Sequence, residues 1–513
     1  MICERALAEI SANRLFGRYT VATFLAPGDQ RLATSSIVAG AANQNLLSAA
    51  IHLPRERRLS LIALTSLVFF TTCGGAYGVE PLVGAVGPSF TVLFLLVTPF
   101  VWSLPISLMV AELTTLLPEE GGYYIWVRNA LGPFWGVQEG VWTMSCCVAL
   151  LAMFPVLFVS YLTYFFPMLA PTADSAHPIL SAFLRWFLAF LVTATGMVVN
   201  LRGSREVGSS AKIGASIVLG AFVMLTLAWV LWGPSAGATF GVLRQDFATH
   251  RRGALLLGLS YVVFNYSGWD NISTYAAEVD RPQRNYPMAI GIALGVVILT
   301  YLLPVLAGVS VTTDPQIWSA DAGWPAVARV LGGKWLGALL AVAGMVSTWG
   351  MFNAQLLYVS RLPFVMACDG WLPKVLAKIS PDTAVPRVAV ICFCGLTAIF
   401  VALPLGSLAV IQCLTYAAAL TLEFLALIVL RFEEPDAARG FRIPGGWWGM
   451  GYVCITPFAF ATFVVYATLR DWRSFPGQLL FVAIAAATGI LLYVWRRRVA
   501  LSSSVPSRSV SAD

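Results

Sequence analysis

Long apolar runs separated by short polar segments make up most of the chain from residue 59 onward. A helix of about 20 apolar residues crosses a bilayer, and most of these runs reach or approach that length. The pattern predicts an all-α polytopic membrane protein with twelve membrane-spanning helices. The expected spans are Leu59–Val86, Phe90–Leu117, Phe134–Phe166, Leu180–Val199, Ser210–Trp232, Gly253–Val279, Met288–Val309, Trp335–Met366, Val388–Leu403, Ser407–Leu430, Gly449–Leu469 and Gln478–Trp495.

Polar residues interrupt two of these runs near their middles. The first run is broken at Thr71–Gly78 (TTCGGAYG) and the sixth at Tyr266–Asp270 (YSGWD). An ionisable residue at the centre of a membrane helix costs about 2.5–3.5 kcal/mol on insertion scales, so Asp270 is expected to face a cavity or pathway. Backbone groups freed by such breaks must be satisfied by protein or water. The alternative is a simple kink in which Asp270 caps the helix that follows.

The two breaks occupy corresponding positions in spans one to five and spans six to ten. This correspondence is typical of transporters built from inverted repeats, in which interrupted helices mark a substrate site near the membrane midplane. We therefore expect an inverted repeat of five helices in which helices 1 and 6 are broken. The expected domains are a disordered cytosolic tail (1–57), a twelve-helix transporter domain (58–498) and a cytosolic C-terminal tail (499–513). The first repeat covers 58–232, the second 253–430, and the last two helices 449–495.

Composition and charge agree with a membrane protein. Of the 513 residues, 58% are hydrophobic and only 11% are charged, less than half the charged share of ordinary soluble domains. With both termini in the cytosol, roughly three quarters of the 32 Lys and Arg residues fall on the cytosolic side. The net charge of +7 is therefore attributed to cytosolic loops next to the lipid bilayer, and no nucleic-acid partner is expected.

The sequence offers no sign of catalysis. No nucleophile–base set, metal-ligand cluster or phosphate-binding loop stands out, so we expect no enzymatic activity, no cofactor and no metal. The nine cysteines lie mostly in apolar runs without metal-ligand spacing and are interpreted as small core residues. The expected location is the plasma membrane. An Arg-rich, acid-poor start leaves an organelle membrane open as an alternative.

Several motifs together resemble the amino acid–polyamine–organocation superfamily over residues 59–445. These motifs are Ala111–Leu113, Pro118–Val127, Ala277–Pro282, Asn285–Pro287, Ser360–Pro363, Asp369–Lys374 and Phe441–Pro444. Within the superfamily, Tyr77–Pro81 and Gly132–Gly140 are most similar to the polyamine uptake transporters of plants and protists. The resemblance implies a leucine-transporter-like fold and import of organic cations (putrescine, spermidine and spermine) together with protons by alternating access.

Asp270 is the leading candidate for substrate binding. Neutral amino-acid transporters of the superfamily commonly carry Asn after the matching Trp, whereas this chain carries a carboxylate that suits an alkylammonium group. Glu80, just after the first break, and Glu423, deep in span ten, are candidates for a second ammonium group, and Glu423 also for proton transfer. A solvated, loop-facing Glu80 is the alternative. Glu139 is expected to have a structural role, and Glu112 to pair with a base.

The aromatic and glycine residues at the breaks complete the expected site. The aromatic faces of Trp269, Phe264, Tyr77 and Tyr266 attract organic cations by about 0.5–2 kcal/mol per contact, although ordinary packing is the alternative for each. The resemblance assigns Phe264 to an outer gate. Backbone groups freed at Gly74, Gly75 and Gly268 are expected to assist binding.

Lys212 is the candidate for ion coupling. It matches a lysine that, in some relatives, places its ammonium group where sodium binds in the leucine-transporter fold. A cytosolic anchor that follows the positive-inside pattern is the alternative. Ser347 and Thr348 are weaker candidates for the same cation site.

The leading hypothesis is a proton-coupled polyamine importer. An amino-acid transporter or exchanger, for cationic or neutral substrates, is the first alternative, because amides at Gly74 and Gly75 suit a substrate carboxylate. The second alternative is a nutrient sensor that binds its ligand without transporting it. Competition of arginine or spermidine with putrescine uptake separates the first two hypotheses.

Overall fold

The computed structural model describes residues 59–119, 121–169, 178–249, 261–262, 264–271, 273–274, 279–314, 316–318, 323–470 and 476–503. These residues form helices, and they contain no strand apart from an isolated parallel bridge between Leu59 and Val279. The all-helical prediction is therefore confirmed for this part of the chain. The predicted tail over residues 1–57 lies outside the described residues, as do residues 250–260 and 275–278 of the predicted sixth span and its flank.

The helices follow one another with short connections. In chain order they are α3 (Leu61–Thr72), α4 (Glu80–Thr98), the π-helix η2 (Pro99–Ser103), α5 (Leu104–Leu116), α6 (Gly122–Leu131), α7 (Pro133–Leu162), η3 (Pro167–Leu169), α8 (Pro178–Arg202), α9 (Ser204–Trp232), α10 (Ala236–Thr249), α12 (Pro282–Val311), α13 (Gly323–Val359), α14 (Arg361–Cys368), η6 (Lys374–Ala377), α15 (Arg387–Phe400), α16 (Leu405–Glu433), α17 (Gly446–Arg470) and α18 (Pro476–Ser503).

Eight helical segments in the described residues are long and apolar enough to cross a membrane. They correspond to predicted spans two, three, four, five, seven, eight, ten and twelve. Their bounds are Val86–Leu116, Pro133–Leu162, Pro178–Arg202, Ser204–Trp232, Pro282–Val311, Gly323–Cys368, Leu405–Glu433 and Pro476–Arg498. The shorter apolar helices α3 and α15 fall within predicted spans one and nine. A multi-pass helical membrane protein is thus supported.

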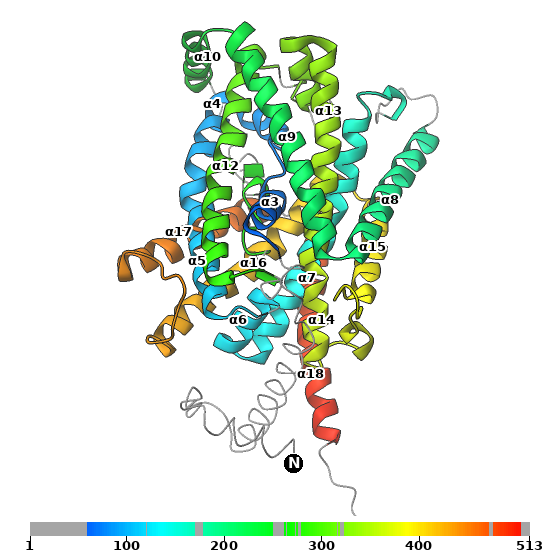
Figure 1. Ribbon diagram of the computed structural model, residues 1–513, viewed down its shortest axis with the longest axis vertical. Helices are drawn as coiled ribbons and strands as arrows, with labels where there is room; N and C mark the ends of the chain where they lie inside the picture. The colour runs from blue at the N-terminus through cyan, green and yellow to red at the C-terminus, as the bar shows by residue number, and fades with distance from the viewer. Residues whose placement is uncertain are drawn as a thin grey trace, which may run out of the picture. The chain divides into compact units, whose positions relative to one another are not determined.

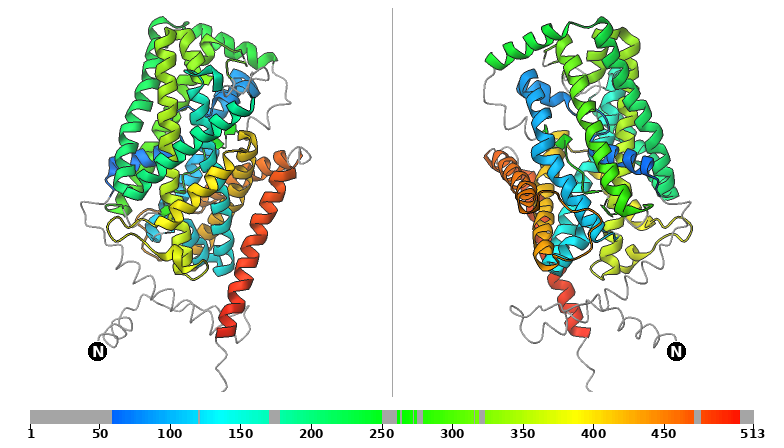
Figure 2. Two further views of the ribbon diagram at one scale, coloured as in Figure 1. Left: turned by 90° about the vertical axis from the view of Figure 1, so that its right-hand side faces the viewer. Right: turned by 60° about the vertical axis from the view of Figure 1, so that its left-hand side comes forward.

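The core of the described bundle is built around α7 and α16. These two helices pack against each other more extensively than any other pair, and 72% of the apolar window of each is buried. The broken helix α3 lies in the interior, in contact with α9, α12 and α13 (Figure 1). By contrast, α18 runs along the edge of the bundle with only 11% of its window buried (Figure 2). The innermost helices therefore carry the candidate site.

Two features of the fold differ from the expected span pattern. Helix α10 lies in a segment that the sequence analysis treats as an outer loop, because α10 is too short and too polar to read as a span. It packs on α4, where the Ser89 amide donates a 2.9 Å hydrogen bond to Asp246 Oδ2. In addition, α4 joins the end of predicted span one to the start of span two through a sharp turn at Gly87 (φ 76°, ψ 170°).

Candidate functional site

The first break separates α3 from α4 by a short non-helical segment. Gly74 and Gly75 adopt left-handed φ angles of 59° and 102°, which glycine tolerates far better than other residues. The Gly74 carbonyl accepts a hydrogen bond from the Ser347 hydroxyl. The Tyr77 hydroxyl donates a 2.7 Å hydrogen bond to the Leu340 carbonyl. Both contacts tie the broken segment to α13, and the first of them satisfies the Gly74 carbonyl freed by the break.

The second break begins after a short helical segment that ends at Asn265. Gly268 has a φ of 95°, and a Cβ atom built on it would lie 2.4 Å from the Thr71 carbonyl oxygen at the first break. The Asn265 side chain also donates a 2.8 Å hydrogen bond to the Gly78 carbonyl. The two interruptions, almost 200 residues apart in sequence, are therefore in direct contact. Only glycine allows the approach at residue 268.

A cavity lies where the two breaks meet α7, α13 and α16. The space there that protein atoms leave unfilled is about 640 Å³, a value that includes open solvent. Of the predicted site residues, Tyr77, Phe264 and Gly268 line this cavity. Its remaining wall is mostly apolar or neutral polar, and the described lining residues include no charged side chain. Any charge that acts on a ligand from the described part of the chain therefore lies behind this wall.

Asp270 lies behind the cavity wall and is only 2% exposed. The Tyr416 hydroxyl donates a 2.5 Å hydrogen bond to Asp270 Oδ1, and it accepts a 3.0 Å hydrogen bond from the Gly268 amide. Tyr416 itself lines the cavity, so it links the cavity wall to the carboxylate. Tyr416 is not among the site residues expected from the sequence. The only available signal was a phenol in an otherwise apolar run, and nothing in the spacing connected it to Asp270.

Trp269 and Tyr266 do not line the cavity. Both side chains are fully buried, and the Trp269 indole donates a 3.0 Å hydrogen bond to the Tyr266 carbonyl. The Tyr266 ring packs edge-on against Tyr301 at 4.9 Å between centroids, and its hydroxyl donates to the Leu95 carbonyl. Their placement matches the packing alternative and differs from the expected cation contact. Gly74 and Gly75 also lie outside the cavity lining.

Glu80 is buried, with 2% of its surface exposed, so the solvated alternative does not describe it. One carboxylate oxygen accepts a 2.6 Å hydrogen bond from the Gly78 amide, and the other accepts a 3.0 Å hydrogen bond from the Tyr161 hydroxyl. A Cβ atom on Gly323 would lie 2.8 Å from the same carboxylate, which places Glu80 against the start of α13. Its two oxygens are thus engaged by the protein at the start of α4, away from the cavity lining.

Lys212 is not brought to the site. Its side chain is exposed on α9, whereas the adjacent Ala211 is buried. Lys212 therefore does not occupy the buried, sodium-like site that was expected. Its exposed side chain is compatible with the alternative of a surface anchor. The physical reason is the helix phase: residue 212 falls on the outward face of α9. Of the weaker candidates, Ser347 binds the first break, while the Thr348 hydroxyl donates 3.0 Å to the Gly344 carbonyl within α13.

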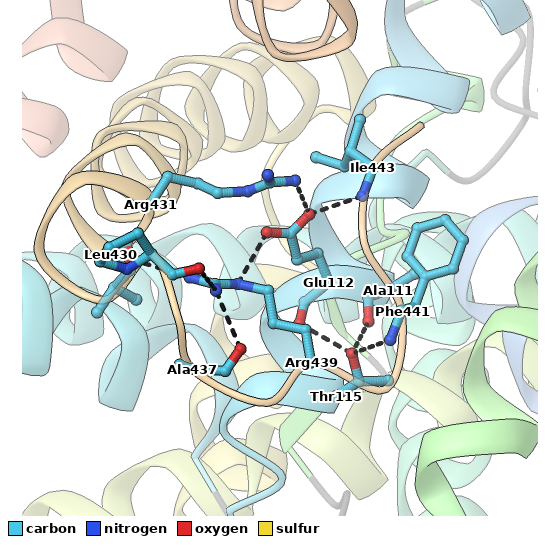
Figure 3. Close-up of polar contacts among 10 residues, drawn as sticks. Ala111, Glu112, Thr115, Leu430, Arg431, Ala437, Arg439, Phe441 and Ile443 are labelled. Atoms are coloured by element: carbon cyan, nitrogen blue, oxygen red, sulfur yellow. Dashed lines mark hydrogen bonds and ion pairs between the residues drawn. The ribbon is translucent and has the colours of Figure 1, made fainter. Parts of the chain in front are cut away.

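The predicted base pairing of Glu112 is confirmed. Glu112, near the end of α5, forms buried ion pairs with Arg431 of α16 and Arg439 of the following loop, the latter at 3.2 Å (Figure 3). The Ile443 amide donates a further 2.8 Å hydrogen bond to the same carboxylate. Close by, the Phe441 amide donates 3.0 Å to the Thr115 hydroxyl. The cluster fastens the segment between α16 and α17 to α5.

A second ion pair joins α6 to the end of α14. Arg128 contacts the Asp369 carboxylate, and the Tyr124 hydroxyl donates a 2.7 Å hydrogen bond to the same oxygen. The start of α6 also packs on the segment that follows the second break, where the Gly121 amide donates 3.1 Å to the Thr274 carbonyl. Helix α6 therefore covers one end of the site.

Long apolar helices around a central cavity at two touching helix breaks are typical of membrane transporters. The profile of the amino acid permease family matches residues 59–493. The chain belongs to this family, within the amino acid–polyamine–organocation superfamily, as its motifs indicated.

Plant polyamine transporters are among the similar proteins. A probable polyamine transporter of Arabidopsis thaliana is 31% identical over 442 residues, which cover 85% of this chain and 86% of the relative. The polyamine transporter RMV1 of Arabidopsis thaliana is 32% identical over 404 residues (78% and 79%). The polyamine transporter PUT1 of Oryza sativa subsp. japonica is 32% identical over 417 residues (81% and 75%).

Proposed function

We propose that this protein is a secondary active transporter that imports polyamines together with protons by alternating access. The observation that carries the proposal is the Asp270 carboxylate, held by Tyr416 behind the wall of a cavity whose described lining contains no basic residue. An alkylammonium group supplies the missing positive charge. The polyamine transporters to which the chain is similar support the same substrate class.

The substrate would lie between the two breaks. Tyr77 and Phe264 offer aromatic faces to the aliphatic stem and its ammonium groups. Twelve spans in an inverted five-helix repeat, with both termini in the cytosol and the plasma membrane as location, form part of the proposal. Under it, the ion pair of Arg128 with Asp369 lies on the cytosolic side and helps to close that side of the site.

An amino-acid substrate is less favoured by the first break. Binding of a carboxylate there requires free amides, but the Gly74 amide donates 2.9 Å to the Phe69 carbonyl. The Gly75 amide likewise contacts the Cys73 sulfur at 3.3 Å. The buried Asp270 would also repel a substrate carboxylate. A non-transporting sensor remains an outcome of the test below.

The test is uptake of labelled putrescine by the purified protein in liposomes, with and without an inward proton gradient. We expect accumulation above the external concentration with the gradient, and its loss when an ionophore removes the gradient. Excess spermidine should inhibit this uptake, and excess arginine should not. Uptake of arginine without uptake of putrescine would overturn the proposal, and binding without any uptake would favour the sensor.

A further inference from the structure

Two helices that line the cavity also carry buried carboxyl groups just beyond it. On α7, Thr143 lines the cavity and donates a 2.7 Å hydrogen bond to Oε1 of Glu139, one turn or about 6 Å along the helix. On α16, Glu423 lies two turns, about 10 Å, from the cavity residue Tyr416. Both steps lead toward α6, because α7 begins directly after α6, and α16, whose C-terminal part reaches Glu112 near the end of α5, also packs against α6.

These carboxyl groups form one cluster with Asp270. Helices α6, α7 and α16, which carry Tyr123, Glu139 and Glu423, all pack against one another, so these groups and Asp270 lie near enough to interact electrostatically. Tyr123 of α6 interacts electrostatically with all three. We call Tyr123, Glu139, Asp270 and Glu423 the acidic cluster. Its four residues come from α6, α7, α16 and the second break, which are far apart in the sequence.

Much of the hydrogen-bonding capacity of the acidic cluster is unused. Both carboxylate oxygens of Glu423, Oε2 of Glu139 and the Tyr123 hydroxyl have no hydrogen-bond partner in the described part of the chain. Each of these three side chains is fully buried. No ion pair to a Lys, Arg or His is found for Glu139, Asp270 or Glu423 among those residues, in contrast to Glu112. Buried polar groups are normally satisfied, so this concentration of unpaired atoms points to a ligand.

The chemistry of the cluster selects the type of ligand. No group of three or more acidic, His or Cys side chains in the described residues is close enough to hold a metal ion. A primary ammonium group carries one positive charge and three N–H donors, which can reach separate acceptors. The Tyr123 ring and hydroxyl add an aromatic face and an oxygen acceptor. The separate carboxylate and hydroxyl oxygens of the cluster therefore suit the three N–H donors of an alkylammonium group.

We propose that Tyr123, Glu139 and Glu423 of the acidic cluster form a second subsite, which binds the leading ammonium group of a diamine or polyamine on the α6 side of the cavity, while Asp270 serves the ammonium group that stays in the cavity. The inference rests on the proposed function. The aliphatic stem and the second ammonium group then stay in the cavity against Tyr77 and Phe264. Because the Tyr416 hydroxyl holds Asp270, the ammonium group that stays in the cavity replaces this hydrogen bond. The subsite thus favours substrates with two ammonium groups over those with one.

The test compares two amines with the same four-carbon stem. Putrescine has an ammonium group at each end, and butan-1-amine has one, so the ratio of their inhibition constants against labelled putrescine uptake reports on the second subsite. We expect the wild-type protein to prefer putrescine. Glu423→Gln and Glu139→Gln should each reduce this preference by about tenfold or more, mainly by weakening putrescine binding.

The matched control is Glu433→Gln, the same substitution on an exposed side chain of the same helix α16. It should leave the preference unchanged. Thermal unfolding of each purified variant separates lost binding from lost folding, and the two cluster variants provide independent tests. Folded cluster variants that keep the wild-type preference would overturn the subsite alone. A wild-type protein without putrescine uptake would overturn the proposed function and this inference together.

Discussion

Asp270→Asn removes one negative charge from the site and leaves its shape almost unchanged. The Asn side-chain oxygen can still accept the hydrogen bond that the Tyr416 hydroxyl donates at 2.5 Å. Tyr416 in turn still accepts from the Gly268 amide at 3.0 Å, so the wall between the second break and α16 is kept. The substitution therefore separates the charge of Asp270 from its structural contact.

The expected size of the effect follows from the loss of a charge-assisted hydrogen bond. Hydrogen bonds to charged groups contribute about 1.5–3 kcal/mol, whereas a neutral bond contributes about 1 kcal/mol. The difference is about 0.5–2 kcal/mol, so at about 1.4 kcal/mol for each factor of ten the apparent affinity for putrescine should fall about 2- to 30-fold. The free energy of unfolding should change by about 1 kcal/mol or less, because the Asn side chain has the same size at this buried position and still accepts the hydrogen bond from Tyr416.

The assay is the initial rate of labelled putrescine uptake into liposomes as a function of concentration, with the amount of inserted protein measured in each sample. Asp314→Asn provides the charge control, since Asp314 lies in a loop where its side chain accepts from the Gln316 amide. We expect the control to match the wild type in KM and in thermal midpoint. Asp270→Asn should match the wild type in thermal midpoint but should have a higher KM for putrescine.

A folded Asp270→Asn variant whose KM for putrescine stays within twofold of the wild-type value would refute the role of this charge. A large fall in thermal midpoint would instead assign Asp270 to the capping alternative, in which the carboxylate serves the helix rather than the substrate.

Two further substitutions test the architecture of the site. Gly268→Ala should abolish uptake, because the added Cβ would lie 2.4 Å from the Thr71 oxygen. Gly132→Ala, with nothing within 4 Å of the added Cβ, should keep uptake and lose about 1–3 kcal/mol of stability, because φ 89° and ψ 171° lie in a region that is essentially restricted to glycine. Equal uptake by both variants would contradict the close contact of the breaks. Glu112→Gln should lower the free energy of unfolding by about 3–5 kcal/mol, because Arg431 is left without its buried anionic partner. Tryptophan fluorescence during thermal unfolding measures this loss, and an unchanged midpoint would contradict it.

The features that could be predicted from the sequence are those set by the residue types within a single continuous segment. The eight long apolar helices were predictable because burial in a bilayer requires a continuous apolar run. The two breaks were predictable because glycine and an ionisable group inside such runs are costly unless they serve a site. The pairing of Glu112 was predictable in the same way, since a buried carboxylate needs a compensating charge.

Features that depend on the rotation of a helix about its axis were not predictable. A helix that is apolar nearly all round, such as α7 or α16, carries no signal for the face that lines a cavity. Trp269 and Lys212, both predicted site residues, illustrate the consequence: the first packs inside the protein and the second faces outward. Tyr416 meets Asp270 across 146 residues, a contact that only the folded chain creates.

Short helices form a second class of missed features. α6 and α10 lack the length and apolarity of a span, so an analysis by hydrophobic runs places them in loops. Yet α6 contributes Tyr123 to the acidic cluster and Arg128 to the ion pair with Asp369. Its role became visible only when the helices that it covers were placed around it.

The most direct test of the central claim is equilibrium binding of labelled putrescine to the purified wild-type protein, with unlabelled spermidine or arginine as competitor. The claim is that the cavity between the two breaks binds an organic cation through the Asp270 carboxylate. We predict saturable binding that spermidine displaces and arginine does not. Absence of putrescine binding, or displacement by arginine but not by spermidine, would contradict the claim.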